Sequence, residues 1–321
     1  MTELQRAIRS QPSELERLVT CDVSALVGRL EGARRVWLVG TGSSQHVAEL
    51  GALVLTGAGL DARWSGSFEF ARLAPRPGPG DAVILISHTT RTAYALAARE
   101  VAVSSGATVT SITGCGGGWP EAIETVAMER SQTYTVSVTS ALMVLLLLAG
   151  ELGARGLARS DLSAAVQRLR TIVLEGEVPE VEPPDRALVL VGSGAGAVSA
   201  REGALKLREA ARVIAEGYGA EYLLHGHAVP LSPRDSLLVI GAKADGDGLL
   251  RTLGRAAAGE GLAVAHVDEP SIGHPVLAQL PIIARLQLLA SRLAQARAAD
   301  PDTAIVGHWA DDALWTIGRP E

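Results

Sequence analysis

Three charged residues with helical spacing, Glu202, Lys206 and Glu209, are the strongest candidates for chemistry in this sequence of 321 residues. Positions i, i+4 and i+7 share one face of an α-helix, so two carboxylates and an ammonium group would lie side by side. A carboxylate can move a proton from carbon, and a nearby ammonium group can stabilise the oxyanion that develops. The alternative is a solvated charged face, whose ion pair contributes about 0.3–0.5 kcal/mol.

The segment that carries these residues, 188–214, has the pattern of a strand, a glycine turn and a helix. An apolar run, 188–191, precedes the turn 192–196 (GSGAG), and a helical pattern covers about 198–214. A separate apolar stripe on that helix is predicted to pack on a sheet; it consists of Gly203, Leu207, Ala211 and Ile214. A strand, glycine turn and helix can present backbone N–H groups to an anion, although the glycine turn alone is a weak signal.

The same pattern occurs earlier in the chain. Residues 36–55 (VWLVGTGSSQHVAELGALVL) align without a gap with 188–207 (LVLVGSGAGAVSAREGALKL), and 81–96 align with 235–250. The sequence therefore predicts two copies of one unit. Strands that alternate with helices indicate an α/β fold, with two tandem, doubly wound parallel-sheet subdomains of the flavodoxin-like three-layer type. Ligands in such sheets bind at the carboxyl ends of the strands.

The pattern also predicts where these subdomains begin and end. We expect an N-terminal helical segment (1–33), a first subdomain (34–155), a helix and linker (156–185), a second subdomain (186–299) and a C-terminal tail (300–321). Two local expectations accompany this division. Proline breaks helices, so the N-terminal segment is predicted to form two helices divided near Pro12. A short strand is expected at Val126–Met128.

A hydroxyl-rich loop follows the predicted strand at 82–86. Residues 87–92 (SHTTRT) place four hydroxyl groups and a histidine directly before a helix, which suits a phosphate monoester. The alternative is a helix cap, which needs only one hydroxyl. The matching loop of the second copy, 241–246 (GAKADG), has no hydroxyl group and contains an aspartate. We therefore expect one composite site, in which the first copy binds phosphate and the second supplies acid–base groups.

Composition excludes several classes of protein. A net charge of −6, without a block of Lys and Arg, argues against nucleic-acid binding. The most apolar run, Ala141–Leu148, is too short to span a bilayer. Charged residues interrupt the N-terminus, so no secretory signal is expected and the interpretation is a cytoplasmic protein. Cys21 and Cys115 lack the spacing of a metal site or disulfide, and no metal is expected.

Three stretches resemble the sugar isomerase (SIS) family, and specifically the double-SIS isomerase domain of the glucosamine-6-phosphate synthase type. They are the turn 40–44 (GTGSS), the loop 87–92 where the family has SQSGET, and the run 202–209 (EGALKLRE) followed by Ala215-Glu216 and Leu224-His225-Gly226. The combination of EGALKL, a glutamate and HG is highly specific. The resemblance covers nearly the whole chain and implies that both subdomains are of SIS type.

The resemblance also implies roles for individual residues. Those expected to hold the substrate phosphate are Ser44, Ser87, His88, Thr89 and Thr92, and those expected elsewhere around the substrate are Gly42, Ser43 and Val138. Glu209 would be the base that moves a proton between C1 and C2 of the sugar, and Glu202 and Lys206 would line the same site. His225 would assist ring opening from the neighbouring subunit of a homodimer. No metal or other cofactor is implied, and the expected partner is a sugar phosphate.

Several positions depart from the family pattern. Thr90 and Arg91 replace the glycine and the acid of the phosphate loop, and the tail, where the family has a sugar-contacting lysine, contains none. His308 or Arg319 is a candidate substitute, although no pattern identifies either. His227 replaces a proline and is expected to be a surface histidine. No glutaminase domain precedes the isomerase-like region, so glutamine-dependent amination is not expected.

Three functions remain open at the level of sequence. The first is a phosphosugar aldose–ketose isomerase, and the second is a deglycase or deaminase that releases an amine from a fructosamine or amino-sugar phosphate. The third is a non-catalytic sugar-phosphate sensor. The presence of Glu202, Lys206, Glu209 and His225 favours an enzyme, because a sensor needs only the phosphate loop. Apolar helices expected at 138–153 and 280–298 add to the expectation of a homodimer.

Overall fold

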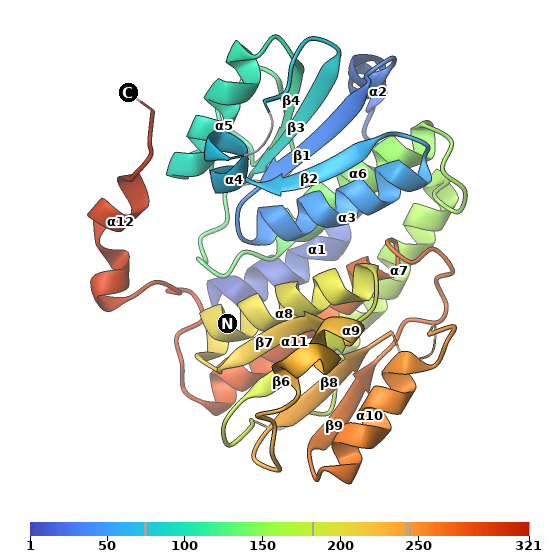
Figure 1. Ribbon diagram of the computed structural model, residues 1–321, viewed down its shortest axis with the longest axis vertical. Coiled ribbons are helices and arrows are strands. Elements are labelled where there is room, and N and C mark those ends of the chain that lie inside the picture. Colours follow the sequence, from blue (N-terminus) through green and yellow to red (C-terminus); the bar gives the residue numbers. More distant parts are fainter. Residues whose placement is uncertain (74–75, 182, 242, 244, 321) are drawn as a thin grey trace. The chain divides into compact units, whose positions relative to one another are not determined.

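The computed structural model describes residues 1–73, 76–181, 183–241, 243 and 245–320 (Figure 1). Ala242 and Ala244 of the predicted loop 241–246 therefore lie outside the described residues. The strands are β1 (Arg35–Gly40), β2 (Ala62–Gly66), β3 (Asp81–Ser87), β4 (Thr108–Thr113), β5 (Ala122–Glu124), β6 (Leu188–Gly192), β7 (Ala215–Gly219), β8 (Ser236–Ile240) and β9 (Ala263–Val267).

The described helices divide by position along the chain. In the first half they are α1 (Glu3–Val19), α2 (Ser24–Leu30), α3 (Ser43–Gly57), α4 (Ser67–Arg72), α5 (Ala93–Ser104) and α6 (Val136–Glu151). In the second half they are α7 (Arg159–Glu175), α8 (Ala195–Ala211), α9 (Ala220–Tyr222), the π-helical turn η1 (Leu223–His227), α10 (Leu249–Gly259), α11 (Gln279–Ala296), the 3-10 turn η3 (Gly307–Ala310) and α12 (Asp312–Thr316). None of these helices combines the length and apolar character needed to cross a membrane.

The strands form two parallel sheets with matching order. The larger sheet runs β2-β1-β3-β4-β5 and the smaller β7-β6-β8-β9, and every described pairing between neighbours is parallel. The larger sheet has the 2-1-3-4-5 order of flavodoxin-like folds. The predicted fold of two doubly wound parallel-sheet α/β subdomains is therefore confirmed. In each sheet the chain first adds a strand on one side and then continues on the other side. This reversal lies between β1 and β3 in the larger sheet and between β6 and β8 in the smaller one.

Contacts between residues divide the chain into two compact units. One, the first-sheet unit, comprises residues 13–129, 136–164 and 305–321, and the other, the second-sheet unit, comprises 1–12, 130–135 and 165–304. Neither unit is continuous in sequence: each consists of three segments, and α1 contributes residues to both. Each unit contains one sheet and the helices that cover it.

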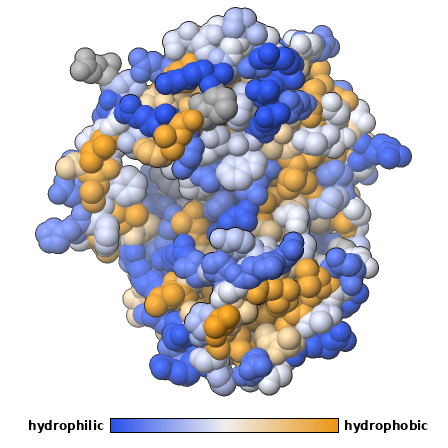
Figure 2. Space-filling model, in the orientation of Figure 1, coloured by the Kyte–Doolittle hydropathy of each residue, from blue (hydrophilic) through white to orange (hydrophobic). Residues whose placement is uncertain are grey.

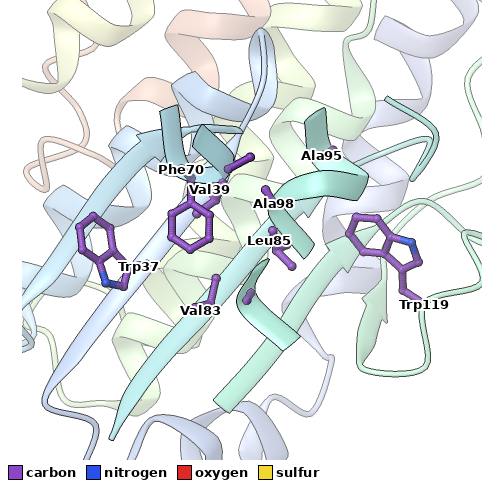
Figure 3. Packing of buried hydrophobic residues seen from close by; sticks show 10 residues of the cluster. Trp37, Val39, Phe70, Val83, Leu85, Ala95, Ala98 and Trp119 are labelled. Carbon is purple, nitrogen blue, oxygen red and sulfur yellow. The ribbon is translucent and has the colours of Figure 1, made fainter. Parts of the chain in front are cut away.

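In the first-sheet unit, helices cover both faces of the sheet. Trp37, Val39 and Leu85 point to the face covered by α4 and α5, where they pack with Phe70 and Ala98 (Figure 3). Trp37 and Phe70 meet edge to face, with ring centroids 6.0 Å apart. The opposite face carries α3 and α6. These strands are buried on both faces, which explains why they appear in the sequence as unbroken apolar runs.

Glycines in α3 and α8 allow close packing on the sheets. A Cβ atom at Gly51 would lie 2.5 Å from Leu38 of β1 and 2.6 Å from Leu145 of α6. A Cβ atom at Gly203 would lie 2.9 Å from Leu190 of β6 and 2.8 Å from Leu286 of α11. The shared Gly-Ala-Leu of the two aligned segments therefore has the same steric cause in both units.

The helices expected at a dimer interface are instead core helices. Residues 136–149 of α6 are all buried, and α11 buries 280–287 without interruption. The sequence pattern therefore predicted the helices correctly, but their apolar character reflects packing inside the chain. This removes the sequence argument for a dimer interface along these helices.

Three local predictions were wrong. α1 continues through Pro12, and the break comes after Val19. Proline removes one helical N–H, and the fully buried Gln11 compensates by donating from Nε2 to the Ile8 carbonyl oxygen at 3.2 Å. α8 ends at Ala211 because Arg212 takes a positive φ of 55°, so Ile214 lies outside the helix and is exposed. The strand expected at 126–128 is at Ala122–Glu124.

Candidate functional site

The two glycine turns have nearly the same backbone. Gly42 and Gly194 adopt φ values of 59° and 53° with ψ values of −128° and −123°. Residues that have a Cβ atom rarely adopt this backbone conformation. A Cβ atom at Gly40 would lie 2.4 Å from the backbone of Ser44, and one at Gly192 would lie 2.3 Å from that of Gly196. The G-x-G spacing is therefore what lets each strand turn directly into its helix.

The turn and the hydroxyl-rich loop of the first-sheet unit meet at one edge of the sheet. β1 and β3 are neighbours, with Val39 paired to Leu85. The turn that carries Gly42, Ser43 and Ser44 and the loop 87–92 therefore leave adjacent strands at their carboxyl ends. This is the point where the winding direction reverses, and ligands of doubly wound sheets bind at such points. Val138 belongs to the same unit but is buried in α6.

The loop holds its shape through its own hydroxyl groups. Ser87 Oγ accepts a hydrogen bond from the Thr90 N–H at 3.2 Å, and Thr89 Oγ1 accepts one from the Arg91 N–H at 3.4 Å. Thr90 Oγ1 donates to the Gly117 carbonyl oxygen at 2.7 Å. Thr90 adopts a positive φ of 56°, an unfavourable conformation for a β-branched residue. The backbone therefore keeps the conformation that the family's glycine would favour, even though Thr90 replaces it.

In the described part of the chain, no side-chain cap is found at the start of the helix that follows this loop. Thr92 is the N-cap residue of α5, and its side chain makes no capping hydrogen bond. The alternative interpretation of the loop as a hydroxyl-rich helix cap therefore fails. In the second-sheet unit, by contrast, Asp245 Oδ2 accepts hydrogen bonds from the N–H groups of Leu250 (2.7 Å) and Arg251 (3.3 Å) at the start of α10.

The His88 side chain packs against Gly114 and accepts a hydrogen bond from the backbone of Glu129. Its Nε2 accepts a hydrogen bond from the Glu129 N–H at 3.1 Å, which leaves the hydrogen of the neutral ring on Nδ1. Its ring also occupies the space above Gly114, where a Cβ atom would lie 2.6 Å from Nδ1. Burial lowers the pKa of His88, and the nearby Glu129 carboxylate partly offsets this effect. The sequence contained no signal for Glu129, which orients His88 from 41 residues away.

The three charged residues of α8 form one contiguous group. Lys206 Nζ lies 2.5 Å from Glu209 Oε2 and 3.7 Å from Glu202 Oε1. The side chains of Glu202 and Lys206 are each 1% exposed, whereas that of Glu209 is 20% exposed. The solvated-face alternative is therefore wrong for Glu202 and Lys206. Burying charged groups is unfavourable unless they are paired, so their pairing across one helix face is a structural requirement.

His225 and His227 lie on η1, directly after the strand and short helix that follow α8. The His225 side chain is 74% exposed, and its Nε2 lies 3.7 Å from a carboxylate oxygen of Glu221. His227 is half-buried and stacks on Tyr218 and Tyr222, with ring centroids 4.5 Å away in both cases. His227 therefore keeps partial exposure, and its ring contacts both tyrosine rings. Spacing alone did not indicate this stack.

Metal ligation has no evident place in the part of the chain that the structure describes. Within it, no group of three or more His, Cys, Asp or Glu residues is arranged to hold a metal ion.

Sequence comparison finds relatives of one kind. The isomerizing glutamine–fructose-6-phosphate aminotransferase of Pyrococcus horikoshii is 27% identical over 304 residues, which cover 84% of this chain and 50% of that protein. The enzyme of the same name from Bacteroides thetaiotaomicron is 28% identical over 236 residues, 66% of this chain and 38% of that protein. The chain thus spans about half the length, or less, of these relatives. No family model matches it.

Solved structures share the whole fold. The tagatose-6-phosphate ketose/aldose isomerase of Escherichia coli superimposes with a TM-score of 0.80 over 96% of this chain and 97% of that chain, at 18% identity. A glucosamine-6-phosphate deaminase of Thermotoga maritima gives a TM-score of 0.75 over 94% of this chain and 97% of that chain, at 20% identity. One of these proteins is an isomerase and the other a deaminase, so the shared fold does not distinguish the two reactions.

Proposed function

We propose that this protein is a phosphosugar aldose–ketose isomerase that acts on a hexose phosphate or an amino-hexose phosphate. The observation that carries the proposal is the group on α8, in which a buried ammonium lies between two carboxylates. The names of the sequence relatives and of the Escherichia coli structure support a phosphosugar substrate.

Glu209 is the proposed base. A carboxylate that takes a proton from carbon must reach the substrate, and Glu209 is the only one of the two paired carboxylates with substantial exposure, 20% against 1% for Glu202. In the aldose-to-ketose direction Glu209 would take the C2 proton, while the electrons of the C–H bond form an enediolate. Transfer of the hydroxyl proton from O2 to O1 and return of the carbon-bound proton to C1 would then give the ketose.

Lys206 is proposed to stabilise the oxyanion of that enediolate. Its ammonium group is buried, and an ionic interaction is stronger in a site that excludes water. Lys206 also lies 2.5 Å from Glu209, which favours the ionised carboxylate that a base requires. Glu202, more buried and 3.7 Å from Lys206, is proposed to fix the position of the ammonium group.

The loop after β3 is proposed to hold the phosphate, together with the turn after β1. Ser87, Thr89 and Thr92 supply hydroxyl groups at the start of α5, whose first turn is not capped by a side chain. Ser44 lies in the first turn of α3, at the same edge of the sheet. Hydroxyl groups beside a helix N-terminus are suited to the several acceptor oxygens of a phosphate monoester.

We retain the homodimer and the role of His225 in trans as parts of this proposal. The segment around His225 leaves large apolar side chains exposed, including Tyr222 at 62%, Leu224 at 52% and Val229 at 84%. Figure 2 shows hydrophobic surface in the region where Figure 1 draws α9. A second copy that covered this surface would also enclose His225.

Release of an amine is the second candidate function. A deaminase or deglycase would use the same proton transfer by Glu209 and then lose nitrogen from the substrate. The deaminase structure has this fold as well, so the two candidate functions have to be distinguished by the reaction product. A sensor is disfavoured, because phosphate recognition alone gives no reason to bury Lys206 and Glu202.

The decisive experiment replaces the two carboxylates separately. We expect Glu209→Gln to lower turnover by about two to four decades, the range for one general base, while affinity for the sugar phosphate changes only a few-fold. It should also abolish exchange of the substrate C2 proton in deuterated solvent. Glu202→Gln should have a smaller effect. Glu260→Gln, at the exposed end of α10, is the matched control and should leave turnover unchanged.

The assay uses a panel of hexose, amino-hexose and fructosamine phosphates, with products and ammonia measured by mass spectrometry. Ammonia release would identify the second candidate function. Normal turnover by Glu209→Gln together with loss of turnover by Glu202→Gln would reverse the two roles. Full activity in both variants would exclude the α8 group from catalysis.

A further inference from the structure

A cavity in the second-sheet unit shares no lining residue with the groups assigned above. Its volume is about 660 Å³, within the range of about 300–1,000 Å³ that is usual for small-molecule sites. It opens at the carboxyl ends of β8 and β9, where Lys243 follows β8 and Asp268 follows β9. In α/β sheets this edge is where ligands bind.

Two residues that line the cavity, Glu177 and Arg285, belong to a network of paired charges. Arg285, which is 7% exposed, donates to Glu269 and to Glu177, at 2.9 Å in each case. Arg168 donates to the same two carboxylates, at 2.7 and 2.8 Å to Glu177 and 3.0 Å to Glu269. Hydrogen bonds from Arg168 hold the pKa of Glu177 below its ordinary value. Two cations and two anions therefore balance each other in this network.

The walls carry a net positive charge. Lys243, Arg251 and His266 line the cavity from three different elements, and the only further carboxylate among its described lining residues is Asp268. One oxygen of Asp268 accepts a hydrogen bond from the backbone N–H of Lys243 at 2.7 Å, which holds the loop against β9.

We propose that this cavity binds a small, multiply charged organic phosphate, as a site separate from the proposed catalytic groups. Lysine and arginine recognise phosphate as a point charge and as a planar fork, respectively, and His266 adds a third polar group. Val178, Pro179 and Val267 supply an apolar wall for the carbon part of the ligand. The inference does not depend on the isomerase proposal, because it uses none of the same residues.

Calorimetric titration with pyrophosphate tests this site. The titrations use a Ser87→Ala, Thr92→Ala background, which suppresses phosphate binding at the loop after β3. We expect one site per chain in that background. Adding Lys243→Ala and Arg251→Ala should weaken binding by at least about 100-fold, because each group provides a charge-assisted hydrogen bond. Arg255→Ala, one turn further along α10 and outside the cavity, is the charge-matched control and should bind as the background does.

A second measurement uses the unmodified chain, so that it does not depend on the stability of a variant. The imidazole NMR signal of His266, identified by its loss in His266→Gln, should shift on addition of pyrophosphate and saturate at the calorimetric affinity. An unchanged signal, or equal binding by the Lys243→Ala, Arg251→Ala and Arg255→Ala proteins, would overturn the proposal. Equal affinity for citrate would overturn the assignment to phosphate.

Discussion

The loops after β3 and β8 occupy equivalent places in two sheets with matching strand order. They differ in whether a side chain accepts hydrogen bonds from the first N–H groups of the following helix. The loop after β8 places the Asp245 carboxylate on the first N–H groups of α10. The loop after β3 supplies hydroxyl groups and leaves the start of α5 without a side-chain cap. A carboxylate at a helix N-terminus occupies the position that an external anion would take and repels one. A single acid can therefore close a helix N-terminus to an external anion while the surrounding fold is retained. The cavity proposed above would accordingly hold its phosphate through the side chains of Lys243, Arg251 and His266 and not through the N–H groups of α10.

The two glycine turns behave in the opposite way. Gly42 and Gly194 share the same backbone conformation, and Gly40 and Gly192 share the same close contact with the following helix. The two units therefore have the same backbone conformation at the glycine turns, where steric contacts determine it. They have different side chains in the loops, where a ligand can be contacted.

The largest expected effect tests the difference between the loops. Ser87→Ala combined with Thr92→Ala should weaken binding of the hexose phosphate that the assay panel identifies by at least about 100-fold, because each lost hydrogen bond to a charged group costs about 1.5–3 kcal/mol. Asp245→Ala is the matched change in the other loop. It should leave this affinity unchanged and destabilise α10 by about 1 kcal/mol, the usual cost of a lost cap.

Calorimetry and thermal unfolding measure these two quantities. Unchanged affinity in the Ser87→Ala, Thr92→Ala protein would remove the loop after β3 from the site. A large loss of affinity in Asp245→Ala would show that the loops do not differ as the comparison states.

The next effect tests the similarity of the turns. Gly40→Ala and Gly192→Ala should each lower the free energy of unfolding by about 1–3 kcal/mol or more, because the new Cβ atom would lie within 2.4 Å of backbone atoms. Gly57→Ala, at the open end of α3, has space for a side chain and should be neutral or stabilising by about 0.4–1 kcal/mol. Urea unfolding provides the measurement. Tolerance of alanine at one turn but not at the other would break the equivalence.

A smaller effect is expected at Thr90. Thr90→Val keeps the positive φ with a β-branched side chain and loses the hydrogen bond to Gly117, so it should cost about 1 kcal/mol or more. Thr90→Gly loses the same hydrogen bond but relieves about 1–2 kcal/mol of backbone strain, so it should be less destabilised. The ranking of the two variants in urea unfolding is the test. If Thr90→Val were more stable than Thr90→Gly, the positive φ at this position would impose little backbone strain.

The smallest effect concerns pH. The pKa of His88 is lowered in the folded protein, so its contribution to stability is complete above the unfolded pKa of about 6.5 and declines as the pH falls toward the folded value. His88→Gln keeps an acceptor for the Glu129 N–H but cannot titrate. The midpoint of thermal unfolding of the unaltered protein should therefore fall more steeply between about pH 7 and 5 than that of the variant. Parallel profiles would contradict the assignment of a buried, neutral His88.

The strands that sequence reasoning found share one property. This property belongs to β1, β3, β6 and β8, which are central strands buried on both faces, so each is an unbroken apolar run with a glycine or hydroxyl residue at or directly after its end. β7 was missed because AEGYG has neither an apolar run nor alternation. Its place beside β6 depends instead on Gly217, where a Cβ atom would lie 2.4 Å from the Ala200 carbonyl oxygen. Such contacts between segments leave no local pattern.

The sequence by itself determined the two α/β units, the turns and the spacing that puts Glu202, Lys206 and Glu209 on one helix face. These features follow from local sterics and helical periodicity, which act within a few residues. Only the tertiary structure decided that Lys206 is buried, that Glu209 is the more exposed carboxylate and that Asp245 caps its helix while Thr92 does not. Burial and hydrogen bonding depend on which distant segments pack together, and the same residue types at the same spacing are compatible with either outcome.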